Sequence, residues 1–161
     1  MSFVSKVKNF DVKRVVVGAP VHVIDKNYVL NTQYINDGQK FPLRVQIPTT
    51  TVYNSLYETN GKFYIDLIMR AEGAFHKLHK DISQLCTSIA NTNTRFKDCE
   101  FIHNIKRVHE DAYSVRIKIP RNGSNFQCKI WNSSNKETTP NSIASGDDVI
   151  CILEIDLSLI H

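Results

Sequence analysis

Residues 113–131 read YSVRIKIPRNGSNFQCKIW, and their pattern predicts the centre of the fold. Apolar and polar side chains alternate over 113–119 and again over 126–131. Because successive side chains of a strand point to opposite faces of its sheet, each run predicts a strand with one apolar face. The Pro-Arg-Asn-Gly segment at 120–123 supplies a turn between the two strands. We therefore expect a hairpin that buries one face against a core.

The other face of this hairpin would carry cations and an aromatic ring. Alternation places Arg116, Lys118, Lys129 and Trp131 there, and Trp131 is the only tryptophan of the chain. Cations bind a phosphate backbone through the release of counterions, and an aromatic ring adds about 1–3 kcal/mol per stacked base. This face indicates binding of single-stranded nucleic acid. A solvated outer face with an isolated tryptophan is the alternative interpretation.

Further residues extend this predicted surface. Tyr64 and Arg44 fall on the corresponding face of earlier expected strands. The expected loops contribute more cations and aromatic rings, which are Lys106, Arg107, Arg121, Lys136, Tyr53 and Tyr57. Glu154 and Asp156 alternate onto the outer face of the last expected strand, where they would repel phosphate. A nucleic-acid strand is therefore expected to avoid that edge.

The rest of the chain predicts a mainly β fold with one helix. Strand-like runs and polar loops alternate along it, with strands at 11–17, 22–30, 41–48, 62–69, 101–107 and 149–160 and loops at 49–60 and 132–146. A helix over about 72–91 is predicted by apolar residues three or four positions apart, at Phe75, Leu78, Ile82, Leu85 and Ile89. This order favours an oligonucleotide/oligosaccharide-binding barrel with one inserted helix, and a sandwich carrying a helix is the alternative.

Composition adds broad constraints. Of the 161 residues, 42% are hydrophobic and 22% are charged, which predicts one globular domain over 1–161 with 1–10 as a flexible arm. The net charge of +4 is compatible with an acidic partner without requiring one. The four cysteines form no CxxC pair, and the sequence shows neither a secretory signal nor an apolar run of membrane-spanning length. A reducing intracellular setting is therefore expected.

Signals of catalysis are weak in this sequence. It lacks a glycine-rich phosphate loop, a nucleophile elbow and a metalloprotease helix. His76 and His79 are spaced to ligate a metal from one helix face, which would suit a metal-dependent enzyme, but no third ligand is evident. The paired acids at 110–111 and 147–148 are typical of turns. We therefore predict a non-enzymatic protein without catalytic residues, cofactor or metal.

Several stretches, taken in order, resemble a family of viral proteins. They are NGKFYIDLIM at 60–69, FHKLHKDISQL at 75–85, YSVRIKIP at 113–120, FQCKIWNSSNKE at 126–137 and SIASGDDVICILEIDLSLI at 142–160. They resemble the single-stranded DNA-binding proteins of short-tailed phages and, more closely, the related proteins of large nucleocytoplasmic DNA viruses. FPLRVQIP at 41–48 is also similar to a strand near the start of the viral members. The resemblance covers about residues 40–160.

This resemblance implies a barrel that coats single-stranded DNA during viral replication or recombination in an infected host cell. It implies that Arg116, Lys118, Lys129 and Trp131 form the binding face. The phage proteins end in an acidic tail with a terminal aromatic residue, whereas this chain ends at His161. The alternative is therefore a viral structural or assembly protein, a minor component of the virion, that uses the barrel to bind protein. That alternative predicts a homo-oligomer or a viral protein partner, and neither interpretation predicts a membrane.

Overall fold

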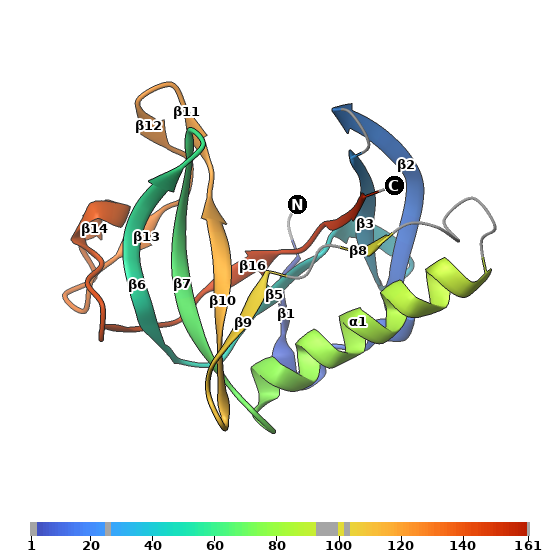
Figure 1. The fold of residues 1–161 in the computed structure, drawn as a ribbon, viewed down its shortest axis with the longest axis horizontal. Coiled ribbons are helices and arrows are strands. Elements are labelled where there is room, and N and C mark those ends of the chain that lie inside the picture. The colour runs from blue at the N-terminus through green and yellow to red at the C-terminus, as the bar shows by residue number, and fades with distance from the viewer. Residues whose placement is uncertain (1–2, 25–26, 93–99, 102–103, 161) are drawn as a thin grey trace. The chain divides into compact units, whose positions relative to one another are not determined.

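The computed structural model describes residues 3–24, 27–92, 100–101 and 104–160 (Figure 1). The chain divides into two compact units, and each unit is assembled from separate segments of sequence. The first unit comprises 1–48, 72–103 and 150–161, and the second comprises 49–71 and 104–149. The single domain over 1–161 therefore stays a prediction.

The first unit contains two small sheets. The larger has the order β2-β3-β17-β8 with β4 paired to β3, and its strands are β2 (Val15–Ile24), β3 (Asn27–Asn36), β4 (Gln39–Pro42), β8 (Glu100–Phe101) and β17 (Leu157–Ile160). The smaller has the order β1-β5-β16, with β1 (Ser5–Lys6), β5 (Arg44–Gln46) and β16 (Ile152–Glu154). Two short 3-10 helices, η1 (Val7–Asn9) and η2 (Val12–Arg14), follow β1. β1 lies within residues 1–10, the segment predicted to be a flexible arm, and it pairs with β5.

Helix α1 (Ala74–Thr92) confirms the helix predicted over about 72–91. Its buried side chains include Phe75, Leu78 and Cys86, and Cys86 joins Leu30 and Leu157 in the core of the first unit. Cys86 is buried and adds to the predicted stripe, in which Leu85 is half-buried, because steps of three or four residues after Ile82 both stay near one face. One helical face therefore anchors α1 to the β3–β17 pair.

The second unit is organised around an open sheet with the order β15-β6-β7-β10-β9. Figure 1 shows β6, β7, β10 and β9 of this sheet side by side. Its strands are β6 (Thr50–Thr59), β7 (Lys62–Arg70), β9 (Ile105–His109), β10 (Ala112–Ile119) and β15 (Asp148–Val149). The second unit also contains two short strand pairs and a 3-10 helix. The pairs are β11 (Arg121–Asn122) with β12 (Asn125–Phe126) and β13 (Ile130–Trp131) with β14 (Glu137–Thr138), and the helix is η4 (Pro140–Ser142). The core of this sheet is the apolar side of β7 and β10, where Ile65, Leu67 and Met69 are almost fully buried.

The mainly β class with one long helix is confirmed, but a closed barrel is not found among the described residues. The sheet of the second unit ends at β15 and β9 without these two strands pairing. β15 has only two residues, and the segments that follow β10 pair with each other instead of closing the sheet. The oligonucleotide-binding topology therefore stays a prediction.

The predicted strand over 126–131 is wrong. Phe126 pairs back to Arg121 in the short β11–β12 turn, and Trp131 pairs with Glu137 in a separate hairpin. The edge of β10 that this strand would have used is occupied by β9, and the backbone N–H of Arg116 donates to the carbonyl of Asn104. The predicted strand over 113–119 is confirmed as part of β10.

Four other segments differ from expectation. The expected loop at 49–60 is β6, and the expected strand at 22–30 is split between the end of β2 and the start of β3. The last expected strand, 149–160, is three short strands because its pairing partner changes from β6 to β5 and then to β3. The expected loop at 132–146 contains β14 and η4.

Candidate nucleic-acid interface

The pairing of β7, β10 and β9 brings a set of polar side chains to one face of the second unit's sheet. Lys118 lies opposite Tyr64, Arg116 lies opposite Asp66, and Lys106 lies opposite Ser114. Directly paired residues of neighbouring strands point to the same face, and alternation along each strand keeps them there. Tyr57 of β6 joins this face opposite Tyr64, and Lys62 joins it by alternation along β7.

We call this surface the Arg116 face. Its members are Asn54, Tyr57, Lys62, Tyr64, Asp66, Lys106, Arg116 and Lys118. Of these eight residues, four are cations and one is a carboxylate. Such an excess of positive charge attracts a polyanion.

The guanidinium of Arg116 lies against two neighbouring aromatic rings. Its central carbon lies 5.1 Å from the centroid of the Tyr64 ring and 5.9 Å from that of Tyr57. Its Nε–H donates to the Tyr57 hydroxyl at 3.0 Å, and the two rings are tilted by 30° with centroids 5.8 Å apart. A planar cation over ring faces gains cation–π attraction, so Arg116 is positioned before any ligand arrives.

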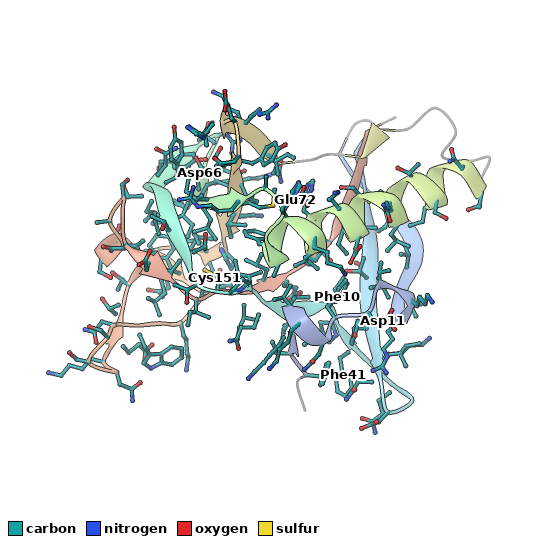
Figure 2. The ribbon with its side chains drawn as sticks, turned by 90° about the horizontal axis from the view of Figure 1, so that it is seen from below. Phe10, Asp11, Phe41, Asp66, Glu72 and Cys151 are labelled. Carbon is teal, nitrogen blue, oxygen red and sulfur yellow. The ribbon has the colours of Figure 1, made fainter. Side chains whose placement is uncertain are left out.

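The hydrogen bonds continue from Arg116 to Asp66. The Tyr57 hydroxyl donates to Asp66 Oδ1 at 2.8 Å, and the Asn54 amide nitrogen donates to Asp66 Oδ2 at 2.8 Å. Partial burial of the phenol, followed by the hydrogen bond to Asp66, raises the pKa of Tyr57 above its ordinary value of 10.0. Tyr57 therefore stays a neutral donor to Asp66 at physiological pH. Asp66 lies among the side chains of this sheet in Figure 2.

A shallow, open depression of about 470 Å³ lies beside this network. It is lined by four residues of the irregular part of β6, by the charged pair and by one serine that precedes β15, namely Asn54, Ser55, Leu56, Tyr57, Asp66, Arg116 and Ser145. The pairing of β6 with β7 shifts register between Val52 and Asn54 and again between Asn54 and Tyr57. Bulges bend a strand locally, and the depression lies along this irregular part of β6.

Two of the predicted cations lie elsewhere on the second unit. Arg107 lies opposite Tyr113, with its guanidinium 6.0 Å from that ring, so alternation places it on the reverse of the Arg116 face. The guanidinium of Arg121 lies 4.6 Å from the Phe63 ring, and Phe63 also belongs to the reverse side. Both cations cover aromatic rings there.

Other predicted residues lie outside the strand pairs that build the Arg116 face. Arg44 belongs to the first unit, where its Nε lies 3.1 Å from a carboxylate oxygen of Glu154. Lys129 is exposed outside any strand, and Trp131 is 55% exposed on the β13–β14 hairpin. Of the twelve residues predicted for this surface, the structure therefore gathers Tyr57, Tyr64, Lys106, Arg116 and Lys118.

Sequence reasoning missed Asn54, Lys62 and Asp66 and assigned Tyr57 to a loop. Alternation along 62–69 already placed Lys62 and Asp66 with Tyr64, so these two could have been found. Asn54 and Tyr57 belong to the Arg116 face because of the register shifts of β6, and no local sequence pattern reveals these shifts.

The described residues hold no group of three or more His, Cys, Asp or Glu side chains arranged to bind a metal ion. None of the described helices is long and apolar enough to cross a membrane. No family model, curated protein or solved structure matches this chain. The resemblance to viral DNA-binding proteins therefore stays an expectation from the sequence.

Proposed function

We propose that this chain binds single-stranded nucleic acid through the Arg116 face, with little sequence preference along most of the strand. The observation that carries the proposal is the Arg116 guanidinium lying against both Tyr57 and Tyr64, with Lys118 directly opposite Tyr64. The two tyrosine rings offer surfaces for stacked bases, and the lysines offer contacts to phosphates. Following the resemblance, we propose DNA as the strand and viral replication or recombination as the setting.

Salt dependence tests the ionic part of this proposal. Binding of a fluorescently labelled 12-residue oligo(dT) is followed by anisotropy between 50 and 300 mM salt. We expect affinity to fall steeply, and Lys118→Ala to weaken binding at low salt and reduce the slope by about 0.7 if Lys118 contacts one phosphate. Lys40→Ala removes an exposed lysine of the first unit and serves as the matched control. Absence of binding at 50 mM salt, or equal losses for both variants, would contradict the proposal.

Stacking is tested at Tyr64. Tyr64→Leu keeps an apolar side chain of similar size but removes the ring, so we expect oligo(dT) affinity to fall by about 1–3 kcal/mol if one base stacks there. The circular dichroism spectrum and melting temperature of the variant show whether the sheet is intact. Unchanged affinity in a folded Tyr64→Leu variant would exclude stacking on this ring.

Trp131 favours the second candidate, a structural or assembly protein with a protein partner. It is a large aromatic side chain, 55% exposed, on a hairpin whose turn is fixed by two backbone N–H groups donating to Asn132 Oδ1 at 3.0 and 3.1 Å. Rigid exposed tryptophans are typical of protein interfaces. Because Trp131 is the only tryptophan, its fluorescence distinguishes the candidates. Quenching by oligo(dT) supports nucleic-acid stacking, whereas a shift that depends only on protein concentration supports self-association.

A further inference from the structure

Asp66 has unused acceptor capacity beside the open depression of the second unit. A carboxylate offers about four acceptor positions, two on each oxygen. Tyr57 takes one on Oδ1 and Asn54 takes one on Oδ2, both at 2.8 Å. These two bonds fix the plane of the carboxylate and leave one acceptor position on each oxygen. One remaining position on each oxygen suits a ligand with two adjacent donors.

Arg116 has unused donors at the same depression. Its Nε–H is taken by Tyr57, while its two terminal nitrogens have no hydrogen-bond partner in the part of the chain that the structure describes. Arg116 and Asp66 also form no direct ion pair there, although they lie opposite each other on β10 and β7. The Tyr57 hydroxyl bridges them instead. The pair thus presents a carboxylate acceptor and a guanidinium donor that are separated and both accessible.

Among the natural bases, only guanine has this complementary edge. Its N1–H and 2-amino group are adjacent donors, and its O6 acceptor follows next to them. Cytosine and adenine offer one donor beside an acceptor, and thymine offers one donor between two acceptors. We infer that the depression lined by Asn54, Asp66 and Arg116 is a subsite for one guanine of the bound strand. Asp66 accepts from N1–H and the 2-amino group, and Arg116 donates to O6.

The same carboxylate keeps phosphate out of this depression. Like charges at short range repel, so the backbone of the strand passes over Lys62, Lys106 and Lys118 while one base turns toward Asp66. This inference depends on the proposed function and adds a preference at a single base position. Elsewhere on the bound nucleic acid, stacking and phosphate contacts do not depend on the base sequence.

The test compares three labelled oligonucleotides of the same length. They are oligo(dT), oligo(dT) with one central guanine, and oligo(dT) with one central inosine, which keeps N1–H and O6 but lacks the 2-amino group. We expect the guanine strand to bind about ten-fold more tightly than oligo(dT), as for a bidentate base contact, and inosine to lose most of that gain. This series uses only the wild-type chain, so it does not depend on the folding of a variant.

Asp66→Asn then tests the residue assignment. The substitution replaces one acceptor oxygen by a donor, so we expect the ratio of guanine-strand affinity to oligo(dT) affinity to fall to about one, whatever the change in oligo(dT) affinity itself. Lys40→Ala, which lies in the first unit, should keep the full preference. Failure of oligo(dT) to bind at low salt overturns the proposed function. Binding of all three strands within two-fold, or a guanine preference retained in Asp66→Asn, overturns only the guanine subsite. If arginine amide binds in the depression and guanine does not, the guanine subsite is overturned in favour of a site for a protein ligand.

Discussion

Arg116 shows at the residue scale why a guanidinium differs from an ammonium on this surface. Its planar group contacts two rings and still donates Nε–H to Tyr57. Lysine would keep the charge, but its flexible point charge would lose the stacking and the fixed hydrogen bond. Arg116→Lys should therefore weaken oligo(dT) binding about five-fold, or about 1 kcal/mol, while leaving the salt slope unchanged. Anisotropy titrations at several salt concentrations measure both quantities, and equal affinities would mean that only the charge of Arg116 matters.

Asp111 gives a pH-dependent prediction at the same scale. His109 Nδ1 lies 2.6 Å from Asp111 Oδ1 in the exposed β9–β10 turn, and this hydrogen bond lowers the pKa of Asp111 below its ordinary value of 3.8. A depressed carboxyl pKa stabilises the folded state above pH 3.8, and that stabilisation is lost as pH falls through the folded-state pKa. His109→Ala should return the Asp111 pKa toward 3.8. Carbon-13 NMR titration of the carboxyl group measures it, and an unchanged midpoint in the variant would show that His109 is not the cause.

Turn chemistry can be tested at the scale of single elements. Asn60 and Gly61, between β6 and β7, have φ of 51° and 76°, as a type I′ turn requires. A Cβ at Gly61 would meet no atom within 4 Å, so the cost of Gly61→Ala comes from the backbone alone, about 1–2 kcal/mol. Gly18 lies in β2 without a positive φ, and Gly18→Ala should be close to neutral. Urea denaturation measures both variants, and equal losses would contradict this account.

The regularity of the apolar pattern explains which elements could be predicted from the sequence. β7, β10 and α1 have regular apolar periods and were found. β6 was missed because its two register shifts break the alternation, although the Asn60-Gly61 turn requires a strand before it. The error at 126–131 has a different cause, since local alternation cannot show that β9 already occupies the neighbouring edge of β10. Only the part of the Arg116 face that β7 and β10 contribute could therefore be predicted from the sequence.

The packing of α1 can be followed through Cys86. The side chain is 4% exposed, and burial raises the pKa of its thiol to about 11. At pH 8 only about one Cys86 side chain in a thousand is a thiolate, and that thiolate is shielded from reagents. Cys86 should therefore react with iodoacetamide far more slowly than the half-buried Cys128, and the two should react alike in urea. Peptide mass spectrometry measures each site separately, and rapid labelling of native Cys86 would contradict the packing of α1.

At the scale of the whole molecule, each unit is made of segments that are not adjacent in sequence. The chain passes between units at 48/49, 71/72, 103/104 and 149/150. Each unit nevertheless has its own buried core, with Leu30 and Leu157 in the first and Leu67 and Met69 in the second. The Arg116 face is built entirely within the second unit, so its geometry depends on that core. No sequence pattern revealed this interleaving, because alternation and helical spacing report only on neighbours along the chain.

Matched core truncations test whether the two units unfold separately. Leu67 is fully buried and Leu30 is 1% exposed, so truncation of either to alanine should cost about 2–5 kcal/mol. If each core stabilises its own unit, Leu67→Ala should speed amide hydrogen exchange at least ten-fold in β6, β7 and β10 and leave β3 and α1 unchanged. Leu30→Ala should do the reverse. Equal acceleration everywhere would mean that the chain unfolds as one cooperative body, as expected for a single domain over 1–161. Because the proposed interface lies in the second unit, only Leu67→Ala should also weaken oligo(dT) binding as temperature rises.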